Sequence, residues 1–125
     1  MDYILYKEIT EALSQMPPET GGILGRKDNR ITCFYYDEKG SRSEKRYTPD
    51  IDTLNQQIWT WQANDIAFAG IVHSHWTNEQ LSAQDLRYAR QVVHAFGYPI
   101  CMGVYVYTTK KLYMYRVSED AIEIM

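Results

Sequence analysis

The sequence predicts an α+β domain in which a β-sheet is flanked by about three helices. Three segments space their apolar residues as helices do, at intervals of three and four: residues 3–16, 51–61 and 82–96. The run from Ile66 to Val72 is almost wholly apolar, which is typical of a central strand buried on both faces. A chain of 125 residues is long enough for one such core, so we expect a single domain over residues 1–125.

The N-terminal quarter of the chain reads as a helix followed by two strands. The helix would bury Leu5, Ile9, Ala12, Leu13 and Met16. Pro17 and Pro18 would end it, because proline lacks the amide hydrogen that a helix interior needs. A strand is then expected from about Gly22 to Arg26, a turn at Asp28–Asn29, and a second strand from Arg30 to Tyr36.

The next segment is polar and turn-prone. We expect a mobile loop over residues 37–45 and a short strand near Tyr47, and this loop could border an active-site groove. Asp50 or Asp52 can then cap the second helix, since a side-chain oxygen at that position accepts from free amides of the first turn. Its buried stripe would be Ile51, Leu54, Ile58 and Trp61.

The third helix and the C-terminal strands complete the expected order. The helix would bury Leu86, Ala89, Val92, Val93 and Phe96. Gly97 and Pro99 follow it and would end it. His94 falls on the side of this helix opposite Asp85, as an ordinary surface histidine would. Alternating tyrosines and aliphatic residues predict the remaining strands at 100–107, 112–117 and 121–124.

Composition excludes several classes of partner. The net charge is −3, the pI is near 5.5, and no run of lysine or arginine occurs, which argues against nucleic acid or an anionic membrane as the main partner. The chain has no signal-peptide pattern and no apolar run long enough to span a bilayer, so we expect a cytoplasmic protein. Cys33 and Cys101 are far apart in the chain, as reduced cysteines in strands would be.

The motif with the clearest chemistry is His73-Ser74-His75 at the end of the apolar run. Side chains alternate faces along a strand, so the two histidines would point the same way. Asp85 lies on the apolar stripe of the third helix, where a carboxylate needs a partner. Two imidazoles and a carboxylate are a ligand set of hydrolytic zinc sites, which leave the fourth position to water.

Each fragment also has an ordinary structural interpretation. A His-x-His pair on a strand is more often structural than metal-binding. Ser82-Ala83-Gln84-Asp85 is a variant of the capping box, a common start of helices without catalytic meaning. Glu19, taken alone, would be an exposed loop glutamate.

A second stretch, Glu19-Thr20-Gly21-Gly22-Ile23-Leu24-Gly25, changes this balance. Together with His-Ser-His and the later Ser-x-x-Asp, it resembles the JAB/MPN family of JAMM metallopeptidases in its compact bacterial form. The likeness covers nearly the whole chain and keeps the family's order of motifs. It implies a cytidine-deaminase-like α/β sandwich with a curved mixed sheet. The zinc nucleoside deaminases themselves need a Pro-Cys-x-x-Cys ligand pair that this sequence lacks.

The resemblance also implies roles for five residues. His73, His75 and Asp85 would bind Zn²⁺. Glu19 would be the general acid/base and Ser82 would help to stabilise the developing oxyanion, so that metal-activated water hydrolyses a peptide or isopeptide bond.

Two features depart from the family pattern. Trp76 stands where the family usually has proline. Only the six residues from Trp76 to Leu81 separate His75 from Ser82, one fewer than is usual, so a tighter turn is expected.

The resemblance suggests a substrate class and leaves other functions open. The expected substrate is the C-terminal tail of a ubiquitin-like or sulfur-carrier protein. A non-catalytic MPN-type interaction module is the alternative from a different class. A metal-dependent hydrolase of a non-peptide amide would use the same residues.

Overall fold

The computed structural model describes residues 2–14, 19–42 and 47–125. Its elements are α1 (Tyr3–Leu13), β1 (Gly21–Lys27), β2 (Arg30–Tyr36), β3 (Ser41–Arg42), β4 (Tyr47–Thr48), α2 (Ile51–Ala63), β5 (Ala67–His75), α3 (Ala83–Phe96), β6 (Ile100–Val106), β7 (Lys111–Val117) and β8 (Ile122–Ile124). Within these residues, no helix has the length and apolar character needed to cross a membrane.

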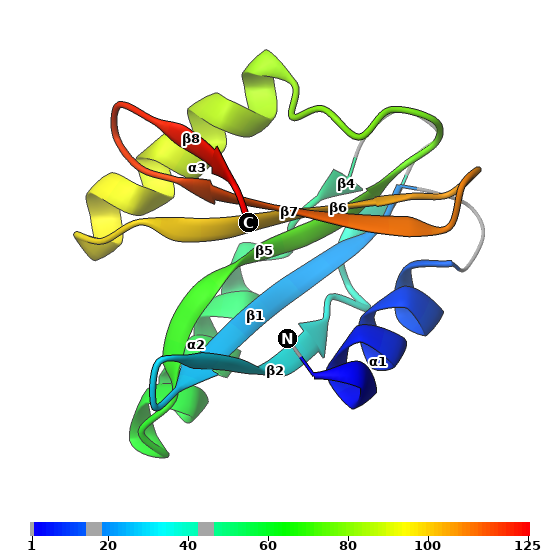
Figure 1. Cartoon of the computed structure of the whole chain (residues 1–125). Coiled ribbons are helices and arrows are strands. Elements are labelled where there is room, and N and C mark those ends of the chain that lie inside the picture. The colour runs from blue at the N-terminus through cyan, green and yellow to red at the C-terminus, as the bar shows by residue number, and fades with distance from the viewer. Residues whose placement is uncertain (1, 15–18, 43–46) are drawn as a thin grey trace.

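Six strands form one mixed sheet in the order β2-β1-β5-β6-β7-β8 (Figure 1). Only β5 and β6 run parallel, and α3 makes the crossover between them. The predicted α+β class, a mixed sheet with three helices, is confirmed. The short strands β3 and β4 pair with each other in a separate two-stranded sheet, and β3 was not predicted.

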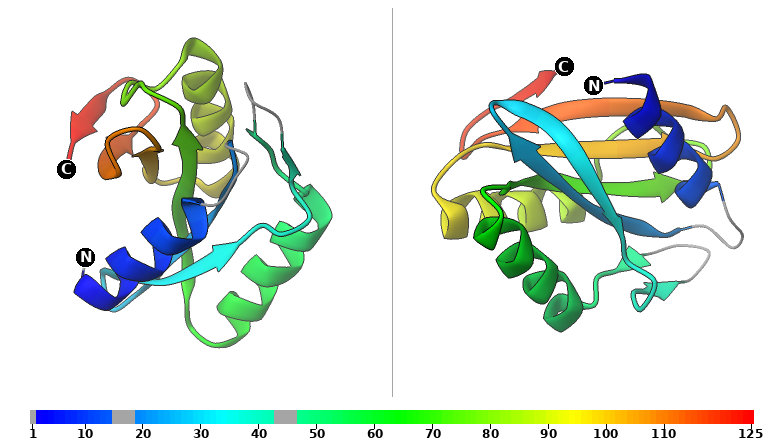
Figure 2. Two further views of the ribbon diagram at one scale, coloured as in Figure 1. Left: turned by 90° about the vertical axis from the view of Figure 1, so that its right-hand side faces the viewer. Right: turned by 90° about the horizontal axis from the view of Figure 1, so that it is seen from below.

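The helices cover both faces of the sheet, so the molecule has three layers (Figure 2). One face packs against α1 through Leu5, Ile9 and Leu13. The other face packs against α2 and α3 through Leu54, Ile58, Trp61, Ala89 and Val93. The single core expected from the sequence is thus divided in two by the sheet, because its central strands bury side chains on both faces.

Several boundaries follow from local chemistry. Asp2 caps α1 by accepting a hydrogen bond of 2.8 Å from the Leu5 amide, a cap that the sequence analysis missed. This helix ends at Leu13 with Ser14 as its C-cap, earlier than the predicted end at Met16, and residues 15–18 lie outside the described residues. The predicted turn between β1 and β2 is confirmed, with φ of 54° at Asp28 and 64° at Asn29. Positive φ at both central residues matches the twist of a hairpin.

Gly70 allows β5 to lie close to β6. A Cβ atom at this position would stand 1.9 Å from the carbonyl oxygen of Cys101, which belongs to the neighbouring backbone and cannot turn aside. The close approach matters for the site because the two histidines follow in the same strand.

Replacing Gly70 with alanine is therefore expected to lower the free energy of unfolding by about 3 kcal/mol or more. Urea unfolding followed by circular dichroism measures the change. Gly97→Ala is the control, since that glycine has a φ of 81° but no atom within 4 Å of an added Cβ, and should cost about 1 to 2 kcal/mol. Equal losses in the two variants would contradict the steric explanation.

Candidate metal centre

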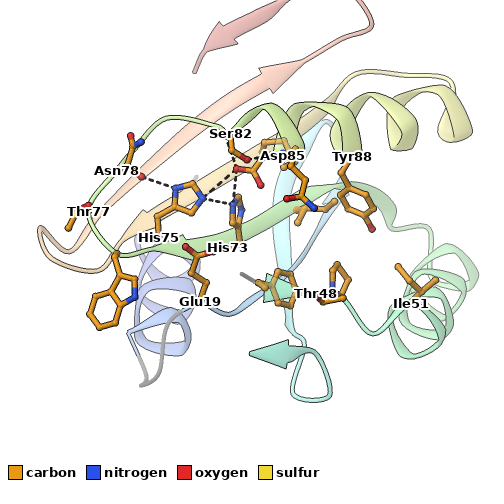
Figure 3. A pocket seen from close by; sticks show the side chains of 16 residues that line it. Glu19, Thr48, Ile51, His73, His75, Thr77, Asn78, Ser82, Asp85 and Tyr88 are labelled. Atoms are coloured by element: carbon orange, nitrogen blue, oxygen red, sulfur yellow. Dashed lines mark hydrogen bonds and ion pairs between the residues drawn. The ribbon is translucent and has the colours of Figure 1, made fainter. Parts of the chain in front are cut away.

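His73, His75 and Asp85 come together where β5 ends and α3 begins (Figure 3). The alternation of β5 places the two histidines on the face that α3 covers, and Asp85 lies in the first turn of that helix. One ligand atom from each residue lies within 4.8 Å of the others. The structure thus joins the three residues that the sequence predicted as a ligand set.

The distances between the three ligand atoms suit a tetrahedrally coordinated metal ion. The Oδ2 atom of Asp85 is 3.4 Å from Nε2 of His73 and 3.4 Å from Nε2 of His75. Ligands at zinc distances in a tetrahedron stand about 3.3 Å apart. The two Nε2 atoms are 2.8 Å apart, so the rings would separate by about half an ångström around an ion.

Hydrogen bonding fixes the state of the His75 ring. Its Nδ1 atom lies 2.8 Å from the carbonyl oxygen of Asn78, which can only accept, so Nδ1 carries the hydrogen and donates it. In the neutral ring the lone pair is then on Nε2, facing His73 and Asp85. A carboxylate and an imidazole lone pair directed at one point favour a cation there, and the donor set fits Zn²⁺.

The pKa values of Asp85 and His75 reflect how closely the three side chains of the cluster lie together. Burial alone would raise the pKa of Asp85, but hydrogen bonds to His73 and His75 hold it well below its usual value. Burial would lower the pKa of His75, yet its bonds to Asp85 and to the Asn78 carbonyl, with the charge of Glu19, raise it. Without a metal ion, the cluster therefore favours a proton on His75.

Glu19 reaches the same place from β1. In the antiparallel pairing of β1 with β5, Gly21 lies opposite His73. The Ser74 amide donates to the Thr20 carbonyl at 2.8 Å, and the Ser74 hydroxyl accepts from the Thr20 amide at 2.9 Å. Ser74 thus holds the segment that carries Glu19.

The charge state of Glu19 suits proton transfer. Burial raises the pKa of its carboxyl, the two histidines oppose that rise, and Asp85 adds to it. A carboxyl whose pKa moves toward neutrality exchanges protons more effectively near physiological pH. Figure 3 shows the Glu19 side chain directed toward the two histidines.

Ser82 is the N-cap of α3, and the capping box that its sequence resembles is present. Its Oγ accepts from the Asp85 amide at 3.0 Å, and Asp85 Oδ2 accepts from the Ser82 amide at 2.9 Å. The two interpretations of this segment are therefore compatible, since the box also orients Asp85 toward the histidines. The hydroxyl hydrogen of Ser82 remains available for donation.

The turn between His75 and Ser82 is anchored on the hairpin of β6 and β7. The carbonyl of Trp76 accepts from the Thr108 amide at 3.0 Å, and the carbonyl of Glu79 accepts from the Tyr115 hydroxyl at 2.6 Å. The Trp76 ring packs edge-on against Tyr107, with ring centroids 5.4 Å apart. These contacts hold the six-residue turn in a conformation that still brings His73, His75 and Asp85 together. They were not predicted from the sequence.

A family model of prokaryotic homologs of the JAB domain matches residues 3–118. The chain belongs to this family. Among solved structures, the JAB domain is similar to the solution structure of protein DSY2949 from Desulfitobacterium hafniense, with a TM-score of 0.67 and 18% identity over 98% of this chain and 83% of that one. That likeness shows the fold alone. No curated protein matches the sequence.

The triad of this JAB domain opens into a cleft of about 530 Å³. It is lined by Glu19, Tyr47, Thr48, Pro49, Ile51, Ile71, His73, His75, Trp76, Thr77, Asn78, Ser82, Gln84, Asp85, Tyr88 and Met102. All five residues to which the family resemblance assigned a role line this cleft. The predicted short strand near Tyr47 is present as β4 and borders the cleft, while residues 43–46 of the expected loop lie outside the described part of the chain.

Tyr47 holds this border in place. Its hydroxyl donates to Oδ2 of the buried Asp37 at 2.6 Å, and the same oxygen accepts from the Asp50 amide at 2.9 Å. The ring packs against Gly21, where a Cβ would stand 2.6 Å from it. The cleft border is thus joined to the segment that carries Glu19, a link that residue spacing alone could not indicate.

Zinc affinity of the JAB domain is expected to fall as the pH falls from about 8 to about 5.5. The pKa of His75 is raised, so its proton begins to compete with the metal above the usual histidine value near 6.5. Competition with a chromophoric chelator across this range measures the change. His94→Gln is the control and should leave the profile unchanged, because His94 is exposed and pairs with Glu119 instead. A constant affinity would contradict the assignment of His75 as a ligand.

Proposed function

We propose that this JAB domain is a zinc-dependent metallopeptidase that hydrolyses a peptide or isopeptide bond. The observation that carries the proposal is the convergence of His73, His75 and Asp85 beside Glu19 in one open cleft. The chemistry that zinc supplies when bound is polarisation of the scissile carbonyl and a lowered pKa of the attacking water.

The protein's own residues would transfer the proton, stabilise the developing negative charge and orient a metal ligand. Glu19 would accept the proton of the attacking water and return it to the departing amine, which its raised pKa favours. The Ser82 hydroxyl would donate to the oxygen on which negative charge develops, an interaction commonly worth about 3 to 4 kcal/mol. The Asn78 carbonyl would keep the His75 ring in its ligating tautomer.

The substrate we propose is the C-terminal tail of a ubiquitin-like or sulfur-carrier protein. An extended tail can bind by adding a strand to an exposed strand edge. β4 lines the cleft and, within the described residues, pairs with β3 alone, so its other edge is available to such a tail.

The test is cleavage of tail fusions by the purified protein supplied with one equivalent of zinc. Each substrate would carry a reporter after the Gly-Gly end of a sulfur-carrier or ubiquitin-like protein, and mass spectrometry would locate the cut. We expect a single cut after the second glycine, abolished by a chelator and restored by zinc. A protein that binds zinc and leaves every fusion intact would end the proposal.

A non-catalytic interaction module remains the second candidate because Trp76 lines the cleft where the family usually has proline. If the indole obstructs the cleft, Trp76→Pro should raise cleavage while zinc content stays constant. Unchanged cleavage in a folded, zinc-binding variant would show that Trp76 does not block the site.

A further inference from the structure

The cleft continues beyond the metal triad into a space that we call the apolar chamber, lined by Ile51, Ile71, Tyr88 and Met102. Ile71 and Met102 are paired neighbours on β5 and β6 and form its floor. Tyr88 follows Asp85 by three residues on α3, so the two side chains share a helix face. Figure 3 shows Tyr88 and Ile51 on the side of the triad away from Thr77 and Asn78.

The chamber is accessible rather than a closed part of the core. Ile51 lies at the first position of α2 with 48% of its surface exposed, although it borders the cleft. The floor residues Ile71 and Met102 are only 6% and 2% exposed. Apolar side chains that converge on a hollow next to a few directed polar groups are typical of a ligand pocket.

The charges of the lining restrict what the chamber can hold. Among the described lining residues, the carboxylates are Glu19 and Asp85, and both belong to the metal end of the cleft. Among the same described residues, no lysine or arginine lines it. A charged substrate side chain would lose its hydration there without a partner among these described residues, whereas an aliphatic one would bury apolar surface.

The distance from the triad sets which substrate residue the chamber meets. Ile71 precedes His73 by two residues on the same face of β5, which corresponds to about 6.6 Å along a strand. An extended substrate covers that length in about two residues. The chamber therefore lies within about two residues of the bond that would be cut.

We infer that the chamber binds a bulky aliphatic side chain of the substrate about two residues from the residue that carries the scissile carbonyl, which in a Gly-Gly tail is a residue outside the glycine pair. The inference rests on the proposed function, because it places the scissile bond at the triad. It adds a side-chain preference that the ligand set and Glu19 do not provide.

The test measures peptide binding apart from cleavage. The probes are N-acetyl-tetraglycine amide and its four variants with leucine at one position, titrated into zinc-supplemented Glu19→Gln protein by calorimetry. We expect leucine at one or two adjacent positions to tighten binding about tenfold over the all-glycine peptide. In methyl NMR spectra, the signals of Ile51, Ile71 and Met102 should shift with that peptide.

Two surface substitutions on α2 make a matched pair. Ile51→Asp should remove the advantage of the leucine peptide, whereas Trp59→Asp should retain it, because Trp59 is 66% exposed on the same helix and does not line the cleft. Should Ile51→Asp unfold, the methyl shifts in the protein with Ile51 intact still locate the peptide.

The outcomes separate this inference from the proposed function. The inference would be overturned if none of the leucine peptides bound more tightly than the all-glycine peptide. It would also be overturned if folded Ile51→Asp protein still bound the leucine peptide more tightly. Cleavage of tail fusions with equal rates for glycine and leucine would preserve the peptidase and also overturn the inference. If the leucine peptide shifts the methyl signals of the chamber but the wild-type protein hydrolyses no substrate, the inferred pocket would be supported and the proposed peptidase activity would be contradicted.

Discussion

Replacing His73 with alanine is expected to abolish zinc binding. The wild-type protein, purified without chelators, should contain about one zinc per chain and the variant none. His73 is buried between β5 and α3, and its Nε2 lies within 3.4 Å of both other ligand atoms. Its loss leaves two ligands, which are too few to hold the ion against dilution. Elemental analysis of matched preparations measures the zinc content.

Two further variants make this result specific. His94→Ala should retain zinc, because that histidine is exposed on the far part of α3. Asp85→Asn should lose zinc as His73→Ala does, since it replaces a charged ligand with a neutral amide of the same shape. Full zinc content in folded His73→Ala would place the ion elsewhere. No zinc in the wild type after reconstitution would favour the interaction module.

Replacing Glu19 with glutamine should lower kcat for tail cleavage by about 10² to 10⁴, with zinc content unchanged. Glutamine keeps the shape of the side chain but cannot carry the proton. Glu19 lies beside the histidines without belonging to the three-ligand group, so the metal site should survive. Steady-state cleavage and zinc analysis of one preparation separate the two effects.

Glu38→Gln provides the control for this experiment, because Glu38 is exposed and does not line the cleft. It should leave both kcat and zinc content unchanged. Undiminished cleavage by Glu19→Gln would assign the proton transfer to another group. Joint loss of zinc and activity would mean that Glu19 contributes to metal binding.

Much of the architecture was predictable because it depends on local periodicity. The apolar run before His73 predicted a central strand, and β5 is that strand, extended to include both histidines. The stripe around Asp85 predicted α3, and Gly97 ends the helix in the left-handed conformation. Alternation along a strand and the helical repeat act over a few residues, so sequence alone reveals them.

Other parts of the site depend on contacts between distant residues and could not be predicted in this way. The tautomer of His75 is set by a main-chain carbonyl at Asn78, and any residue type at that position offers the same group. The turn after His75 depends on Tyr115, far along the chain. β3 has only two residues, too few to show a periodic pattern.

The sequence alone determined the ligand types, the shared face of His73 and His75, and the position of Asp85 at a helix start, because these follow from side-chain chemistry and from the local repeats of strand and helix. Tertiary structure decided that Glu19 meets these residues, through the pairing of β1 with β5 and the hold of Ser74 on Thr20. It also created the apolar chamber, because a hollow between a sheet and two helices exists only once those elements have packed together.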